Sequence, residues 1–293
     1  MTLLIGFDSA WTAQKRGAIV GVVRTVEGGY RELGQPETAS FSEAGSIISE
    51  WRINEKPGAT MILIDQPTIV ANASGHRPVD RLVASPICRR YGGVQPANTG
   101  RRDMFGGQAP VWRFLDMFGG AADPLRPGGS IRVFETYPVL TMMALGWILP
   151  DSRASGRLPK YNPTRRKTFS IGDWRHVCQL LWQEYAGRNL SGLAGWLAEM
   201  KAKEAPGKAD QDRLDACFCL LVALNLAESR ACLMIGNAET GFIIVPQGDG
   251  LQRELEKRCR DTGREAGSWV RSFTFHGLAG VPLDRKHSRA LPQ

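Results

Sequence analysis

The sequence predicts an α/β fold whose core is a mixed five-stranded sheet flanked by helices. Short apolar runs typical of buried strands are interspersed with segments of helical periodicity. The first three runs follow one another over short polar links, as in an antiparallel meander. The other two come after a helix and after a long Gly- and Pro-rich segment, and we expect them to be parallel strands.

The N-terminal half supplies all five expected strands. In chain order they are "LLIGFD" (3–8), "GAIVGVVR" (17–24), "GGYREL" (28–33), "ATMILID" (59–65) and "IRVFE" (131–135). Between the third and fourth strands, residues 41–54 have apolar side chains at helical spacing, and Ser42 is a suitable N-cap. We therefore expect one helix there, which ends at "KPG" before the fourth strand.

A long segment, about residues 66–129, separates the last two strands. Because it is rich in Gly and Pro and too long for an ordinary connection, we interpret it as an insertion that covers the sheet edge and shapes a substrate site. Its stretch "APVWRFLDMF" (109–118) has a helical pattern. His76 and Arg77 could contact substrate here, with a surface turn as the alternative for His76.

The C-terminal half is rich in helices. Helical periodicity covers 174–185, 191–202, 209–230 and 251–260, and a hairpin pattern covers 232–246. The third of these helices is almost wholly apolar after Ala216, which predicts a buried helix. An aromatic strand and a polar tail end the chain. We expect residues 1–246 to form the main domain and residues 247–293 to form an extension packed on it.

Composition restricts the class of protein. The chain has 293 residues, 43% of them hydrophobic and 23% charged, as in ordinary globular proteins. It enters a strand directly after Met1 and holds no apolar run near the roughly 18 residues of a membrane helix, so we expect a cytoplasmic protein with no membrane partner. The 6 cysteines contain no CxxC pair and the 4 histidines are dispersed, which argues against zinc and for reduced thiols.

The chain is basic, with a formal charge of +8 from 37 Lys and Arg against 29 Asp and Glu. Cations cluster beside aromatic residues in the loop "LPKYNPTRRKTF" (158–169). Such loops suit a phosphate backbone, so we expect nucleic acid to bind here, with a merely solvated loop as the alternative. The expected phosphate contacts are Lys160, Arg165, Arg166 and Lys167.

Three of the expected strands end in an acid. Asp8, Asp65 and Glu135 each follow an apolar run, and open α/β sheets bind ligands at strand ends. Asp212 and Asp215 lie three residues apart near the start of the buried helix and so share one of its faces. Turn formation and helix capping are the alternatives for single acids, but the coincidence of three strand ends favours a common site.

Four or five carboxylates at one point require a counter-charge. Two like charges ~4 Å apart repel by about 1 kcal/mol in water and by several kcal/mol in a protein cleft. Mg²⁺ or Mn²⁺ prefers carboxylate oxygen, and a pair of such ions can activate a water and stabilise the leaving oxygen of a phosphodiester. We therefore expect Mg²⁺ or Mn²⁺ as the cofactor.

A resemblance to a known family rests on four motifs in order: "GFDSAW", "ILIDQP", "VFETYP" and "DQDRLDA". Together with the initial meander and the late strand "GFIIVP", they resemble the domain-of-unknown-function family 429, described as predicted RNase H-like nucleases. The resemblance spans most of residues 1–246. It implies an RNase H-like fold related to RuvC-type resolvases, in which acids on the first strand, the fourth strand and a late helix hold the metals.

The resemblance also implies roles for single residues. Carried across, the metal ligands are Asp8, Asp65, Asp212 and Asp215. Glu135 matches a strand acid of the family and would be a further catalytic residue. The family's helix often has adjacent acids where this chain has "DQD", which leaves Asp210 as an alternative to Asp212.

The predicted activity is therefore metal-dependent hydrolysis of phosphodiester bonds. An actin-like or sugar-kinase-like phosphotransferase is one alternative, because its fold has the same strand acid and meander, although the chain shows no convincing Gly-rich phosphate loop. A non-catalytic scaffold that binds nucleic acid or protein is another. A homodimer also stays open.

Overall fold

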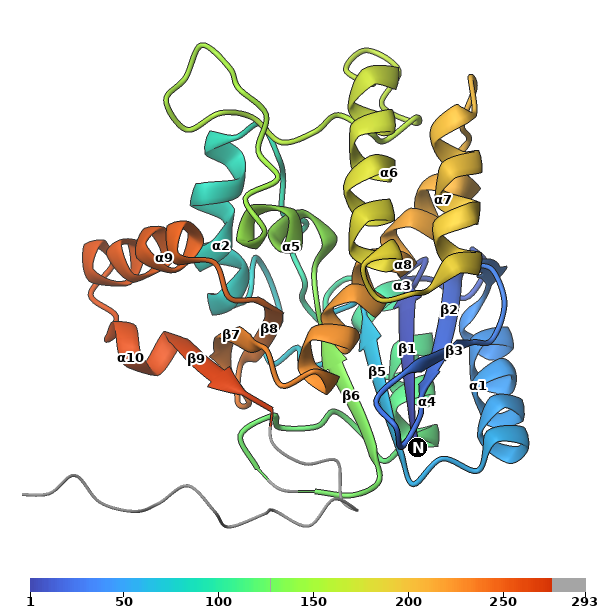
Figure 1. Ribbon diagram of the computed structural model, residues 1–293. Helices are drawn as coiled ribbons and strands as arrows, with labels where there is room; N and C mark the ends of the chain where they lie inside the picture. The colour runs from blue at the N-terminus through green and yellow to red at the C-terminus, as the bar shows by residue number, and fades with distance from the viewer. Residues whose placement is uncertain (127, 276–293) are drawn as a thin grey trace, which may run out of the picture.

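The central sheet of the computed structural model, which describes residues 1–126 and 128–275, has six strands. Five follow the order β3-β2-β1-β5-β6, and β4 pairs with the part of β2 that β3 leaves free (Figure 1). The strands are β1 (Thr2–Asp8), β2 (Gly17–Arg24), β3 (Tyr30–Glu32), β4 (Glu37–Ala39), β5 (Ala59–Ile64) and β6 (Ile131–Glu135). An antiparallel meander (β1 to β3) is followed by parallel strands (β5, β6), as the RNase H-like fold predicts.

Two local details differ from the expectation. The central sheet has a sixth strand, β4, in addition to the five that were predicted. It was not predicted because its three residues are too few to show an alternating pattern. The helix α1 (Phe41–Glu55) is capped by Ser40 rather than Ser42. The Ser40 hydroxyl accepts from the backbone N–H of Glu43, and the Glu43 carboxylate accepts from the backbone N–H of Ser40. This reciprocal capping box decides where the helix begins.

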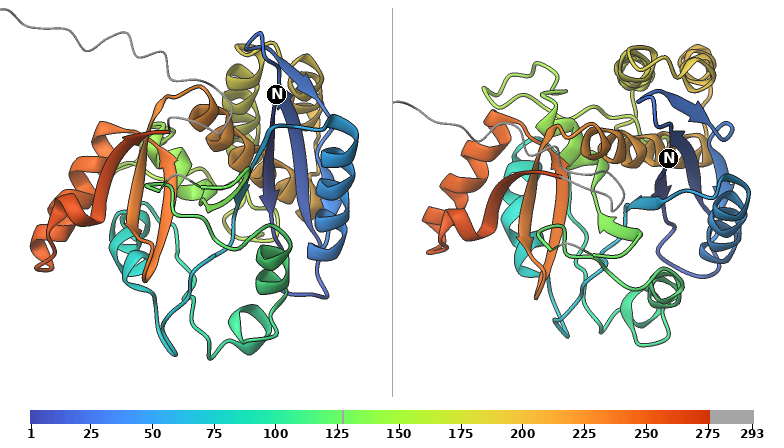
Figure 2. Two further views of the ribbon diagram at one scale, coloured as in Figure 1. Left: turned by 90° about the horizontal axis from the view of Figure 1, so that it is seen from below. Right: turned by 60° about the horizontal axis from the view of Figure 1, so that its bottom comes forward.

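Helices cover both faces of the central sheet (Figures 1 and 2). On one face, α8 (Lys208–Ala227) packs directly on β1 and β2, and α6 (Ile171–Ala186) and α7 (Ser191–Ala202) lie beside it. On the other face, α1 packs together with α4 (Pro110–Met117). Successive residues of β1 divide between the two cores, with Leu4 on the α8 side and Leu3, Ile5 and Phe7 on the α1 side.

A second, smaller sheet lies beside the β6 edge and has the order β8-β7-β9 (Figure 2). Its strands are β7 (Ala231–Asn237), β8 (Gly241–Pro246) and β9 (Val270–Thr274). The predicted hairpin is β7 and β8, and the predicted amphipathic helix is α9 (Asp249–Asp261). The Thr136 hydroxyl, directly after β6, donates to the carbonyl of Ile244 in β8 at 2.7 Å. This bond joins the two sheets.

In its described residues, the insertion between β5 and β6 contains three helices, and it packs on both parts of the molecule. Besides α4, which was predicted, it holds α2 (Pro78–Arg89) and the short α3 (Arg102–Phe105). The helix α2 contacts α9 and the second sheet, whereas α4 contacts α1. The sequence pattern of α2 was hidden by Pro86, which lies inside the helix.

The last described elements are α5 (Pro138–Ala144), which follows β6, and α10 (Ala266–Trp269), which precedes β9. The strand β9 is the predicted aromatic strand, and the predicted polar tail beyond residue 275 lies outside the described residues. None of the helices within the described ranges combines the length and the apolar character that spanning a bilayer requires.

Candidate metal centre

Asp8 and Asp65 lie next to each other where the parallel strands β1 and β5 end, at the carboxyl-terminal end of these two inner strands of the central sheet. The strands β1 and β5 are parallel, with Phe7 paired to Ile64, and the backbone N–H of Asp65 donates to the carbonyl of Phe7 at 2.9 Å. Both strands therefore end at the same level. The indole N–H of Trp11 donates to the carbonyl of Asp65 at 3.0 Å and holds the loop after β1 against the loop after β5.

The helix α8 brings two further acids to this end of the sheet. A Cβ atom at Gly6 would lie 2.2 Å from the carbonyl oxygen of Ala216, so only glycine at this position of β1 allows the helix to pack so closely. Asp215 directly precedes Ala216, and Asp212 lies one turn earlier on the same face. The charges of both acids act on Asp8.

Burial and like charges make the two strand-end carboxylates costly to ionise. Asp8 is only 6% exposed, and Asp65 is partly exposed. Burial, followed by the charges of Asp215 and Asp65, holds the pKa of Asp8 well above its usual range. Burial, followed by Asp215 and Glu135, has the same effect on the pKa of Asp65. Within the described part of the chain, no donor or cation forms a hydrogen bond or ion pair with either carboxylate, although the charge of Lys208 acts on both.

Asp215 is held in place by two hydrogen bonds. Its carboxylate accepts from the hydroxyl of Tyr161 at 2.6 Å and from the side-chain amide of Gln211. Burial nevertheless raises the pKa of Asp215 to about 6. Burial and the nearby Asp215 charge also raise the pKa of Tyr161, so this phenol stays protonated and donates.

A lysine supplies positive charge to the same group of acids. The ammonium of Lys208, in the first turn of α8, forms an ion pair with Asp212. Burial disfavours this ammonium, but the carboxylates of Asp8, Asp212 and Asp215 outweigh burial and raise the pKa of Lys208. Lys208 therefore neutralises part of the charge at this end of the sheet.

Asp210 has a separate role. Its carboxylate accepts from the backbone N–H of Gly207 at 2.7 Å and pairs with Lys203 at 2.7 Å, so it caps the start of α8. Although burial opposes the effect, the hydrogen bonds to Lys203 and Gly207 lower the pKa of Asp210. This placement favours Asp212 over Asp210 as the partner of Asp215 in the acid group.

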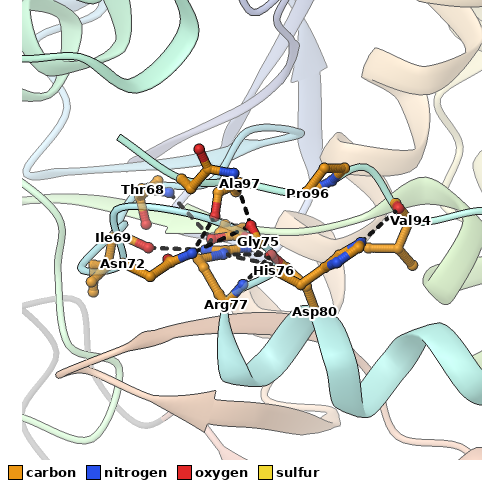
Figure 3. A network of polar contacts seen from close by, with 12 residues as sticks. Thr68, Ile69, Asn72, Gly75, His76, Arg77, Asp80, Val94, Pro96 and Ala97 are labelled. Atoms are coloured by element: carbon orange, nitrogen blue, oxygen red, sulfur yellow. Dashed lines mark hydrogen bonds and ion pairs between the residues drawn. The ribbon is translucent and has the colours of Figure 1, made fainter. Parts of the chain in front are cut away.

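Glu135 lies at the margin of the acid group, in a buried ion network with Arg77 and Asp80. Figure 3 shows Arg77 and Asp80 of this network. Its carboxylate accepts from the Arg77 guanidinium at 2.6 and 2.8 Å and from the backbone N–H of Thr68 at 3.2 Å. Arg77 also pairs with Asp80 at 2.8 Å and donates to the carbonyl of Ile69 at 3.1 Å. Burial raises the pKa of Glu135 to about 7, and Arg77 opposes this rise.

The same network corrects one expectation about the insertion. Arg77, considered as a substrate contact, is only 1% exposed and serves two buried acids. His76 is partly exposed, and its Nε2 atom lies 3.3 Å from the carbonyl oxygen of Val94. Arg77 therefore joins α2 to β6 in the interior.

The basic loop approaches the acid group through its first residues. The Lys160 ammonium donates to the carbonyl of Tyr91, and burial lowers the pKa of Lys160. The next residue, Tyr161, donates to Asp215. The remaining three cations of the loop are exposed, and in the described residues their side chains form no ion pair: Arg165, Arg166 and Lys167.

The donor set suits a hard metal ion, but the side chains do not form a finished coordination shell. As they stand, no group of three or more Asp, Glu, His or Cys side chains among the described residues could hold a metal ion. The four predicted ligands lie close enough for their negative charges to repel one another, and Asp212 forms an ion pair with Lys208. All four are carboxylates, the ligands that Mg²⁺ and Mn²⁺ prefer, and two of them, Asp8 and Asp65, have no hydrogen-bond or ion-pair partner in residues 1–126 and 128–275. The residues therefore fit such ions in kind.

Residues 6–240 match the family described as "Protein of unknown function (DUF429)". The chain belongs to this family. The match includes α8 and all of the central sheet except the first residues of β1, so the acids predicted for the site of this DUF429 protein lie inside it. Neither a curated protein nor a solved structure matches the chain.

Two residues that contact the acids of the candidate site were not predicted. Lys208 stands four residues before Asp212, the spacing of helical ion pairs, and this signal could have identified it. Tyr161 belongs to the expected phosphate-binding loop, but its contact with Asp215 spans 54 residues of sequence. Only the tertiary structure could show that contact.

Proposed function

We propose that this protein hydrolyses phosphodiester bonds of nucleic acid with Mg²⁺ or Mn²⁺ held by Asp8, Asp65, Asp212 and Asp215. The observation that carries the proposal is the pair of carboxylates, Asp8 and Asp65, that have no hydrogen-bond or ion-pair partner among the described residues and lie beside Asp215. Holding these like charges together destabilises the fold without a bound cation. An acid with a purely structural role finds a counter-charge in the protein, as Glu135 does in Arg77.

Each side chain has a defined task in this proposal. Divalent ions would activate a water for attack and stabilise the leaving oxygen of the phosphodiester. Asp8, whose charge interacts with all three other acids, would bridge or share the ions. Asp65 and Asp215 would complete the two sets of ligands, and Tyr161 fixes the orientation of Asp215. Asp212 would be a ligand or would orient the water.

One further observation supports nucleic acid as the substrate. The exposed cations of the basic loop lie on the same connection as Tyr161, so a nucleic-acid backbone bound by these cations would lie close to the acids.

The cysteines support the cytoplasm as the location. The six cysteines are free, and all but Cys88 are buried, which suits a reducing compartment.

Cleavage assays test the proposal directly. We expect the wild-type protein to cleave at least one of four substrates (single-stranded DNA, duplex DNA, RNA or a four-way junction) in Mn²⁺ or Mg²⁺, and to stop in EDTA. Asp8→Asn should reduce the rate about 10³-fold or more, because a charged ligand is lost. Asp210→Asn removes an acid of the same helix that caps rather than joins the group, and it should leave the rate nearly unchanged.

The alternatives give different results in the same experiments. Mn²⁺ binding without cleavage of any substrate would favour the scaffold. A rise in Tm with ATP, together with no cleavage, would favour the phosphotransferase. Equal rates for wild type and Asp8→Asn would show that these acids are not the catalytic site.

Replacing Arg165, Arg166 and Lys167 together by Gln should weaken nucleic-acid binding similarly for all sequences. The slope of log K against log salt should become shallower by about one unit per lost phosphate contact. Fluorescence anisotropy over a series of salt concentrations measures this slope. Lys257→Gln, an exposed cation on α9, is the control. An unchanged slope in the triple variant would mean that the loop is only solvated.

A further inference from the structure

Lys208 lies at a position that an α-helix disfavours for a cation. It is the first residue of α8, directly after the N-cap Gly207, where the positive end of the helix dipole repels positive charge. Its ammonium nevertheless pairs with Asp212, and the charges of Asp8 and Asp215 also act on it. The acid group, rather than the helix, therefore holds this ammonium.

The lysine reaches the acids from the solvent side. Its side chain is 52% exposed, whereas the side chain of Asp212 is only 9% exposed. A long, flexible stem that is half in solvent can turn outward without disturbing the core. The ammonium can therefore leave Asp212 while the helix stays in place.

The carboxylates differ in whether they already have a partner in the protein. Asp8 and Asp65 have no hydrogen-bond or ion-pair partner within the described residues, so a cation can reach them without breaking a contact. One oxygen of Asp212 is already paired with the Lys208 ammonium, so a cation that binds this carboxylate competes with a positive charge already in place. Lys208 therefore opposes a cation at Asp212 more strongly than one at Asp8 and Asp65, on which its charge acts without an ion pair.

We infer that Lys208 is a built-in competitor of the second divalent ion: it neutralises part of the acid group in the metal-free protein and competes with that ion for the carboxylate of Asp212. This inference rests on the proposed function, because it assumes that the acid group binds divalent ions. According to this inference, the protein binds a first divalent ion more tightly than a second one, and the ammonium of Lys208 is the cause of the difference in affinity.

Titration calorimetry of the full chain with Mn²⁺, after removal of metal by EDTA and dialysis, tests the inference. We expect two binding events in the wild-type protein. In Lys208→Met, which keeps the length of the stem but removes the charge, the weaker event should tighten about tenfold, as expected for loss of one partly buried ion pair. Lys208→Arg keeps the charge and should bind Mn²⁺ like the wild type.

Lys203 provides the matched control. It also pairs with an acid of the first turn of α8, Asp210, at 2.7 Å, but that acid caps the helix. Lys203→Met should therefore leave both Mn²⁺ affinities unchanged. The metal-free stability of Lys208→Met should fall at pH 7.5 although the helix dipole alone would raise it, and saturating Mn²⁺ should restore it.

Chemical labelling of lysines gives a readout that needs no substitution. If Mn²⁺ displaces the ammonium from Asp212, an amine-reactive ester should label Lys208 faster with Mn²⁺ than without, while Lys203 should react equally in both. Lys208→Gln, which retains a hydrogen-bond donor for Asp212, replaces Lys208→Met if the latter does not fold.

The outcomes separate the inference from the proposed function. Mn²⁺ binding with the same affinities in wild type and Lys208→Met, or unchanged labelling of Lys208, overturns the inference alone. Absence of Mn²⁺ binding in both proteins overturns the proposed function and the inference with it.

Discussion

Arg77→Met is expected to destabilise the protein by about 3–5 kcal/mol, the usual effect of removing one partner from a buried ion pair. Arg77 is 1% exposed, and the side chains of its partners Asp80 and Glu135 are each 3% exposed. The substitution leaves both carboxylates buried without a counter-charge. It also removes a hydrogen bond to the carbonyl of Ile69, which anchors the start of the insertion. Urea denaturation of the wild type and the variant measures the difference.

Two further variants show whether charge is the cause. Lys257→Met breaks an exposed ion pair with Asp261 and should change stability by less than about 1 kcal/mol. Adding Asp80→Asn and Glu135→Gln to Arg77→Met removes the uncompensated charges and should recover part of the loss. If Arg77→Met unfolds at the same urea concentration as the wild type, this network does not hold α2 to β6.

Asp8→Asn is expected to stabilise the metal-free protein at pH 7.5, although under the proposed function it slows cleavage. Burial and the neighbouring acids raise the pKa of Asp8 in the folded state. The folded state therefore holds a proton more firmly than the unfolded state, so the stability linked to that proton is full at acid pH and lost as the pH rises through the folded-state pKa. Burial likewise raises the pKa of Asp215 to about 6, so ionisation of Asp215 also lowers the stability of the metal-free protein as the pH rises.

The pH dependence provides the measurement. The gain in Tm of Asp8→Asn over the wild type should be larger at pH 7.5 than at pH 4.5, where the native carboxyl already holds its proton for much of the time. Asp210→Asn is the control of opposite sign, because hydrogen bonds lower the pKa of Asp210 and its charge contributes stability that is present at neutral pH. A loss of stability in Asp8→Asn at pH 7.5 would mean that Asp8 has a structural partner.

In saturating Mn²⁺, the wild-type protein should become more stable than Asp8→Asn, the reverse of the order expected without metal. At a hundredfold excess over the dissociation constant, a bound ion stabilises the wild-type protein by about 2.7 kcal/mol. Asp8→Asn should lose most of this gain because it lacks one ligand. Equal metal shifts in both proteins would exclude Asp8 as a ligand.

Local sequence pattern was sufficient to predict the elements that carry the acids. The apolar runs before Asp8, Asp65 and Glu135 are β1, β5 and β6, because a buried strand of a layered α/β fold reads as a continuous apolar run. The three-residue spacing of Asp212 and Asp215 placed them on one helix face. These are properties of neighbouring residues, and they do not depend on distant parts of the chain.

Only the tertiary structure decided which of these acids are neutralised by the protein itself. Glu135 meets Arg77 across 58 residues of sequence, and Asp215 meets Tyr161 across 54. Asp8 and Asp65 meet each other through the register of β1 and β5, with no partner of their own in the described residues. Electrostatic interactions act through space and strengthen on burial. Sequence could therefore predict where carboxylates emerge from the sheet, but the packing of α2 and α8 determines which of them the protein itself neutralises.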